Sequence, residues 1–174
     1  MSEKLRFLIP DGYSLESRQQ FESVGMTLAG ELYGILLQRR LPGAEYDVWF
    51  SSDPGATPPT DAELSGYAGV IWPGCNLTIY HNDDPRVQAH KDLCLRAYEA
   101  GIPQFGSCWA IQLACFVAGG RGGPHPRGAG MGIATKIRPH VQGRKPTLTA
   151  GKAVGSPHFV RQDSTGVAPR GGSS

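Results

Sequence analysis

The chain has 174 residues, of which 40% are hydrophobic and 9% aromatic, and its formal net charge is +2. These values predict one globular domain with a sizeable core. No apolar run approaches the roughly 20 residues that a membrane span requires, and the start of the chain lacks a signal-peptide pattern. We therefore expect a cytoplasmic protein with no membrane partner. Its four cysteines have no metal-site spacing, so we expect free thiols, no metal and no cofactor.

Charge is distributed unevenly along the chain. Basic residues concentrate after Gly120, and Asp163 is the only acidic residue there. Such a segment either meets an anionic partner or is a tail without a selected function. The second interpretation is favoured because the segment lacks aromatic interleaving and a clustered basic run, so a nucleic-acid partner is not expected.

Hydrophobic periodicity and turn residues predict alternating strands and helices in the first two thirds of the chain. In chain order, the expected elements are a strand over 5–9, a helix over 17–40, a strand over 46–50, a loop over 51–60, a strand over 67–72, a helix over 84–100, a strand over 102–105 and an apolar helix directly after Cys108. This alternation predicts a parallel α/β sheet with helices on both faces.

The pattern weakens towards the C-terminus. One further strand is expected over 131–137, and beyond residue 139 the sequence is rich in Gly, Pro, Ser, Thr and Arg without a period. We therefore expect an α/β domain over residues 1–138 and a basic, irregular tail over 139–174. The abrupt change of composition is typical of a truncated or frame-shifted C-terminus, so we expect the C-terminal part of the fold to be incomplete.

The segment around Cys108 carries the strongest chemical signal. The strand over 102–105 runs into Gly106-Ser107-Cys108, and an apolar helix follows at once. A reactive side chain between a strand end and a helix start has the placement of a nucleophile elbow. Gly106 permits the sharp turn, and the helix N-terminus favours the thiolate, which is the nucleophilic form. The expected buried residues of the helix are Ile111, Leu113, Ala114, Phe116 and Val117.

Other residues are expected to lie near Cys108. In a parallel sheet, ligands bind beyond the carboxyl ends of the strands. Asp11, Gly74 and Cys108 each follow a predicted strand. We therefore expect them to share one edge of the sheet, with Cys108 as the most reactive of the four thiols.

Residues 103–112, Pro-Gln-Phe-Gly-Ser-Cys-Trp-Ala-Ile-Gln, resemble the nucleophile segment of class I glutamine amidotransferases. Residues 72–80 and 126–134 are similar to a stand-alone bacterial group of such proteins, and the resemblance covers residues 5 to about 138. It implies a three-layer, flavodoxin-like α/β core. It also implies that a cysteine attacks the side-chain amide of glutamine, or of a related small-molecule amide, releasing ammonia and leaving a glutamyl thioester for water. An ammonia acceptor or a synthetase is the implied partner.

The resemblance also implies roles for individual residues. Cys108 corresponds to the nucleophile, and the backbone N–H groups of Trp109 and Gly74 correspond to the two oxyanion donors. Gln112 corresponds to a residue that contacts the substrate. Two N–H groups aimed at a developing oxyanion would lower the barrier substantially. Plainer interpretations stay open, with Gly74 as a turn glycine and Gln112 as a solvated helix residue.

The chain departs from the family pattern at three places. Ala110 stands where the family has a second glycine after the cysteine, and its methyl group would crowd the approach of helix to strand. Cys75 replaces the second glycine of the loop after the third strand, which puts glutamine in question as the substrate. The family's base and its acidic partner lie on a later loop. Here His158 is the last histidine and has Asp163 nearby, so it is the candidate base, with His125 and His140 next in line, but its neighbours do not match that loop.

Three functions stay open on this evidence. The leading one is a glutamine amidotransferase-like cysteine hydrolase, impaired if its C-terminus is truncated or divergent. The second is a related cysteine peptidase or chaperone-like hydrolase, for which Glu16 would have to lie near Cys108. The third is a non-catalytic protein that keeps the elbow but lacks a base. His81 and His90, which precede Cys108, are expected to be solvated.

Overall fold

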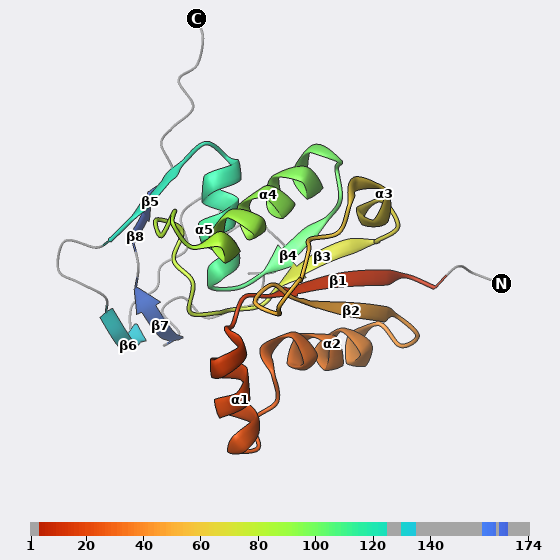
Figure 1. Cartoon of the computed structure of the whole chain (residues 1–174), viewed down its shortest axis with the longest axis horizontal. Coiled ribbons are helices and arrows are strands. Elements are labelled where there is room, and N and C mark those ends of the chain that lie inside the picture. Colours follow the sequence, from red (N-terminus) through yellow and green to blue (C-terminus); the bar gives the residue numbers. More distant parts are fainter. Residues whose placement is uncertain (1–3, 125–129, 135–157, 163, 167–174) are drawn as a thin grey trace, which may run out of the picture. The chain divides into compact units, whose positions relative to one another are not determined.

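The computed structural model describes residues 4–124, 130–134, 158–162 and 164–166 (Figure 1). The chain divides into two units, Met1–Gly122 with Thr165–Ser174 and Gly123–Ser164. The first unit contains every element from β1 to α5, and the second contains β6 and β7.

A four-stranded parallel sheet forms the centre of the first unit. Its strands are β1 (Arg6–Asp11), β2 (Glu45–Phe50), β3 (Gly69–Trp72) and β4 (Gln104–Gly106). The strand order is β2-β1-β3-β4. Phe7 lies opposite both Tyr46 and Gly69, and Ile71 lies opposite Phe105. This is the order of the first four strands in flavodoxin-like sheets, whose switch point lies between β1 and β3.

Helices cover both faces of the sheet, as the alternation of elements predicts (Figure 1). On one face lies α2 (Ala29–Arg40), preceded by α1 (Leu15–Ser23). On the other lie α3 (Asp61–Leu64), α4 (Pro85–Glu99) and α5 (Trp109–Val117). The Asp84 side chain caps α4 by accepting the Arg86 N–H at 2.9 Å. In the described part of the chain, no helix is both long enough and apolar enough to cross a membrane.

The main core lies between the sheet, α4 and α5. Its large members are at most 2% exposed, and they include Leu8, Val70, Trp72, Val87, Leu93, Trp109 and Leu113. Burying each such aliphatic side chain contributes about 1.5–3 kcal/mol. The two helices that flank the predicted site are therefore held by the same core as the strands.

On the opposite face, α2 packs through glycines rather than through large apolar side chains. Gly30 and Gly34 are buried, and a Cβ on Gly34 would overlap the Tyr46 ring. Leu32 is 45% exposed. The Asp11 carboxylate accepts the Gly30 N–H at 2.9 Å, which ties the start of α2 to the end of β1. The close approach of α2 to the sheet depends on the missing side chains.

The single helix expected over 17–40 is wrong, because the chain forms α1 and α2 with a turn between them. Gly25 has a φ of +74°, its N–H donates to the Glu22 carbonyl, and the Met26 N–H donates to the Phe21 carbonyl. This pattern of bonds is a Schellman motif, which ends a helix. Val24 is 71% exposed and Met26 is 55% exposed, so the apolar spacing here does not mark a buried face.

The expected buried face of α5 is wrong in part. Leu113 is fully buried as expected, but Ile111 is 64% exposed, and Ala114 and Phe116 are exposed as well. The helix is apolar nearly all round, so hydrophobicity alone does not identify which side faces the core. The buried residues are Trp109, Gln112, Leu113 and Cys115.

Four short strands follow α5. β5 (Arg121–Gly123) pairs with β8 (Ser164–Gly166), and β6 (Gly130–Ala134) is antiparallel to β7 (His158–Gln162). β6 agrees with the first part of the strand expected over 131–137, and residues 135–137 lie outside the described residues. β7 and β8 fall in the segment expected to be irregular, where the apolar pair Phe159-Val160 is too short to predict a strand. The boundary at residue 138 stays a prediction.

Candidate functional site

The turn between β4 and α5 carries Cys108 at the expected place. The Ser107 N–H donates to the Trp72 carbonyl at 3.2 Å, which fixes the turn to the end of β3. Cys108 is the N-cap of α5, with φ 55° and ψ −95°. No other non-glycine residue among those described has a positive φ. Such a conformation costs roughly 1–3 kcal/mol and persists only where the surrounding structure enforces it. The Cys108 residue itself is exposed.

Gly106 allows β4 and α5 to meet in this turn. A Cβ on Gly106 would overlap the Trp72 carbonyl oxygen and would lie 2.7 Å from the Ala110 Cβ. The Ala110 methyl group, which departs from the family pattern, therefore fits because the residue facing it has no side chain. The departure at Ala110 leaves the strand–turn–helix geometry intact.

Gly74, after β3, faces Cys108. A Cβ on Gly74 would lie 3.3 Å from the Cys108 Cβ and 3.8 Å from its Sγ. Gly74 is not among the glycines with positive φ, so a left-handed turn is not the reason for a glycine here. What the missing side chain provides is space beside the thiol. Its role as an oxyanion donor stays a prediction.

Trp109 and Gln112 are both buried, on the first turn of α5. Trp109 is the first helical residue, so its backbone N–H has no acceptor within the helix. Gln112 is 7% exposed, and its Oε1 accepts the Ile79 N–H at 3.0 Å. The interpretation of Gln112 as a solvated residue is therefore wrong. It supports the loop after β3, and its contact with a substrate stays a prediction.

Sequence reasoning missed two supports of this turn. The Tyr33 hydroxyl, from α2, makes a hydrogen bond with the Ser107 hydroxyl. The Trp109 indole Nε1–H donates to His90 Nδ1 at 3.0 Å. No local pattern in the sequence could pair Tyr33 with Ser107, since the contact joins residues far apart in the chain.

The expectation that His90 is solvated is wrong, because His90 is 0% exposed. Burial, with a smaller contribution from the positive charge of Arg86, lowers the pKa of His90 to about 3. The sequence did hold a signal. Val87, His90, Cys94 and Ala97 recur at spacings of three and four residues, which is the buried face of α4.

Cys75 lies at the same edge of the sheet in a different environment. Its Sγ would lie 3.0 Å from a Cβ on Gly12. Burial raises the pKa of the Cys75 thiol to about 12, and it does the same for Cys94. Both thiols are therefore protonated at neutral pH and are poor nucleophiles.

The residue expected as base lies in the other unit. His158 begins β7, opposite Ala134, in Gly123–Ser164. Its role stays a prediction. His125, His140 and Asp163 lie outside the described residues.

Glu16 gives the peptidase-like alternative no support. It is exposed in the first turn of α1. Within the described part of the chain, no hydrogen bond or ion pair joins Glu16 to the turn at Cys108.

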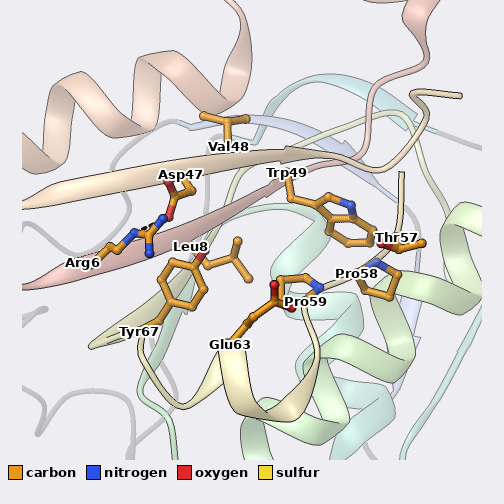
Figure 2. Close-up of a pocket in the computed structure, with 10 residues that line it drawn as sticks. All are labelled: Arg6, Leu8, Asp47, Val48, Trp49, Thr57, Pro58, Pro59, Glu63 and Tyr67. Atoms are coloured by element: carbon orange, nitrogen blue, oxygen red, sulfur yellow. Dashed lines mark ion pairs between the residues drawn. The ribbon is translucent and has the colours of Figure 1, made fainter. Parts of the chain in front are cut away.

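A pocket of about 320 Å³ opens elsewhere on the sheet (Figure 2). Arg6 and Asp47 form an ion pair of 2.6 Å at its wall, Arg6 also lies over the Tyr67 ring, and Glu63 caps α3. None of the predicted site residues lines this pocket, and its charged groups already have partners in the protein. No group of three or more metal-ligating side chains occurs among the described residues.

Fold and geometry together define an α/β protein with a cysteine at a strand–turn–helix junction. No family model matches the sequence. A γ-glutamyl-L-1-hydroxyisopropylamide hydrolase from a Pseudomonas species is 31% identical over 118 residues, which cover 68% of this chain and 39% of that protein.

Two solved structures share the fold. A glutamine amidotransferase from Thermotoga maritima matches 94% of this chain and 61% of its own, with a TM-score of 0.58 and 17% identity. A glutamine amidotransferase from Methylobacillus flagellatus matches 97% and 59%, with a TM-score of 0.60 and 20% identity. The chain thus spans about two fifths of the curated relative and three fifths of the solved structures. The resemblance to class I glutamine amidotransferases that the sequence predicts is confirmed.

Proposed function

We infer that this chain carries the nucleophile of a cysteine-dependent amide hydrolase that acts on glutamine or a related γ-glutamyl amide. One observation carries this proposal: Cys108 is exposed, with a strained backbone, at the N-terminus of α5 and directly beside Gly74. The curated relative supports the γ-glutamyl amide bond as the bond that is cleaved.

In the proposed reaction, the Cys108 thiolate forms a C–S bond with the side-chain carbonyl carbon of the γ-glutamyl group. The carbonyl electron pair moves onto oxygen, and the N–H groups of Trp109 and Gly74 donate to that oxyanion. Removing one such donor typically costs about 10²–10³-fold in rate. When the oxyanion collapses, the C–N bond breaks and the nitrogen leaves as ammonia or an amine after gaining a proton. Water then cleaves the thioester to release glutamate and the thiol.

Formation and hydrolysis of the thioester both need a group that carries a proton, and such a group typically raises the rate about 10²–10⁴-fold. His158 is the proposed carrier, because it is the last histidine after Cys108 and has an acidic residue, Asp163, nearby in the sequence. Gln112 is the proposed substrate contact. Its Oε1 is taken by the Ile79 N–H, so its amide nitrogen is the donor we assign to the substrate.

Glutamine and γ-glutamyl amides share the group that is attacked and differ in the nitrogen that leaves. The turn after β3 reads Pro73-Gly74-Cys75, which departs from the double glycine expected of enzymes that use glutamine. A γ-glutamyl amide of a small amine is therefore the first substrate to test. We further propose that the partner of this chain is an ammonia acceptor or a synthetase. The proposed location is the cytoplasm, where thiols stay reduced.

The test is to incubate the protein with glutamine and with γ-glutamyl-L-1-hydroxyisopropylamide and to measure glutamate release. Hydroxylamine, which converts a glutamyl thioester to a hydroxamate, would trap the intermediate. We expect hydroxamate and glutamate from the wild type and neither from Cys108→Ala, with a 10²–10⁴-fold slower release for His158→Ala.

Two outcomes would lead elsewhere. Glutamate release that persists in Cys108→Ala would overturn the proposed nucleophile. Modification of Cys108 by a γ-glutamyl electrophile, without turnover of either amide, would identify the non-catalytic form.

A further inference from the structure

His90 lies at the centre of a hydrogen-bonded chain that the reaction itself does not use. Its Nδ1 accepts the Trp109 indole N–H at 3.0 Å, and its Nε2 lies 3.0 Å from the Ser51 Oγ. The Ser51 hydroxyl in turn lies 3.2 Å from the Asp11 carbonyl oxygen. This series of hydrogen bonds therefore joins the first turn of α5 to α4 and to the carboxyl ends of β2 and β1.

The direction of every hydrogen bond in this chain is fixed by chemistry. An indole N–H can only donate, so His90 Nδ1 must be the unprotonated acceptor. The neutral ring then carries its proton on Nε2 and donates to Ser51, which leaves the Ser51 hydroxyl to donate to the Asp11 carbonyl. A second proton on His90 would place an N–H against the indole N–H. The very low pKa of this buried imidazole agrees with a permanently neutral ring.

The surroundings of His90 prevent it from turning to another partner. The rings of Trp49, Trp72 and Trp109 have centroids 5.4, 5.5 and 6.1 Å from its own. His90 is 0% exposed, so water does not compete for its nitrogens. The Trp109 indole is consequently held in one orientation by a rigid acceptor.

We propose that His90 is a positioning residue for the oxyanion site: by fixing the Trp109 indole, it fixes the direction of the Trp109 backbone N–H beside Cys108. The inference rests on the proposed function, because it assigns that N–H to the oxyanion. Cys108 precedes Trp109 in a strained conformation, and a strained turn keeps its geometry only while its neighbours hold it. His90 acts through Trp109 and does not touch the substrate.

Two substitutions separate this role from simple packing. In His90→Asn the side-chain oxygen lies near the position of Nδ1, so it can still accept the indole N–H. In His90→Gln the amide reaches the position of Nε2, so it keeps the Ser51 contact and loses the indole. The two side chains are both polar and uncharged, and they differ mainly in which end of the hydrogen-bonded chain they retain. Trp109→Phe removes the indole donor from the other side.

The readout compares two reagents on Cys108. A γ-glutamyl chloromethyl ketone passes through a carbonyl oxyanion and needs the donors, whereas iodoacetamide alkylates the thiolate directly and does not. Rates at Cys108 are followed by intact mass and peptide mapping. We expect His90→Gln and Trp109→Phe to lower the ketone rate by about 10–100-fold. His90→Asn should retain most of the rate, and iodoacetamide rates should change by less than about threefold.

Each other outcome counts against the inference. Equal ketone rates for wild type and His90→Gln would overturn it while leaving the proposed function intact. If the rates of Cys108 modification by the ketone and by iodoacetamide fall together, His90 has a general packing role instead. The same conclusion follows if His90→Asn and His90→Gln lower the ketone rate equally. If the wild-type protein shows no preference for the ketone at Cys108 over its other thiols, the proposed function and this inference both fail.

Discussion

Two neighbouring turns, one after β3 and one after β4, place cysteines at the same edge of the sheet in opposite conditions. Cys108 is exposed with a strained backbone, at the start of a helix. Cys75 follows Gly74, and burial raises its thiol pKa to about 12. α5 begins at the residue after Cys108, whereas α4 does not begin until Pro85. Cys75 is half-buried, and its thiol has a hydrogen bond with the backbone of Leu77 in the loop that leads to α4.

A strand end determines where a side chain lies, and the residues that follow it determine the chemistry of that side chain. A helix that starts at once leaves the side chain at its N-cap exposed, beside a backbone N–H of the first helical residue that has no acceptor within the helix. Where a loop follows instead, as at Cys75, no helix N-terminus faces the thiol, and desolvation keeps it protonated. The two cysteines therefore form an internal control for each other.

The largest expected effect is the difference between Cys108→Ala and Cys75→Ala. We expect the first to lower glutamate release or hydroxamate formation by more than about 10³-fold, and the second to change it by less than about fivefold. At pH 7 only about 10⁻⁵ of the Cys75 thiol would be ionised with a pKa of about 12. Loss of activity in Cys75→Ala with activity kept in Cys108→Ala would reverse the comparison.

A second test alters the turn after β4 without touching its thiol. Gly106→Ala should lower the free energy of unfolding by about 3 kcal/mol, because the new methyl group would overlap the Trp72 carbonyl oxygen. Gly123→Ala is the control, since among the described residues a Cβ there meets nothing within 4 Å. Urea denaturation measures both. Equal stability of the two variants would mean that β4 and α5 are not tightly joined.

A third test uses pH and the histidine that lies near both turns. A Cβ on Gly12 would meet both the Cys75 Sγ and the His90 Cε1. The pKa of His90 is about 3 in the folded protein and about 6.5 when unfolded. Between these values the unfolded state takes up the proton more readily, so the stability due to a neutral His90 is complete above pH 6.5 and is lost as the pH falls toward 3.

At pH 4.5 this loss should be about 2–3 kcal/mol relative to pH 7. The charges that face His90 lie on its own helix, with Arg86 lowering its pKa and Asp84 raising it. Urea denaturation at the two pH values, on wild type and His90→Asn, isolates the contribution of His90 from that of the carboxylates. An equal pH dependence in both proteins would show that His90 is accessible to protons.

The smallest expected effect comes from Gly74→Ala, which adds a methyl group beside Cys108 and so reduces the open space around its thiol. Its Cβ would lie 3.3 Å from the Cys108 Cβ, so a small shift can accommodate it. We expect ketone modification of Cys108 to slow about tenfold, which equals about 1.4 kcal/mol in barrier height. Iodoacetamide modification should be nearly unchanged. A faster ketone reaction in the variant would count against Gly74 as an oxyanion donor.

The sequence predicted the elements that have sharp boundaries. Pro73-Gly74, Gly106 and Asp84-Pro85 mark strand ends and a helix start, and the structure places them there. The break at Gly25 was missed because apolar residues continued across it at helical spacing. Val24 and Met26, next to the break, are exposed, whereas Leu28 after it is buried, so the helical spacing across Gly25 joined residues that do not share one buried face.

For the site, the sequence predicted where Cys108 lies in the fold, but not the side-chain contacts that hold the turn around it. Gly74 and Cys108 came from strand ends, which meet at one edge of a parallel sheet. Tyr33 and Ser51 come from other elements, and their contacts depend on how the helices settle on the sheet. His90 is different, because its position on the buried face of α4 was legible in the spacing of Val87, Cys94 and Ala97.

The two glycines of α2 also restrict where that helix can lie. Gly30 and Gly34 are one turn apart and sit against the sheet, with Val48 and Tyr46 below them. Sliding α2 by one turn, about 5.4 Å, toward its N-terminus would bring the side chain of Gln38 to the place of Gly34, which only a glycine fits. The two glycines thus fix the position of α2 along its own axis relative to the sheet. Its outward apolar residues can change freely, while Tyr33 remains opposite Ser107 in the turn that carries the thiol.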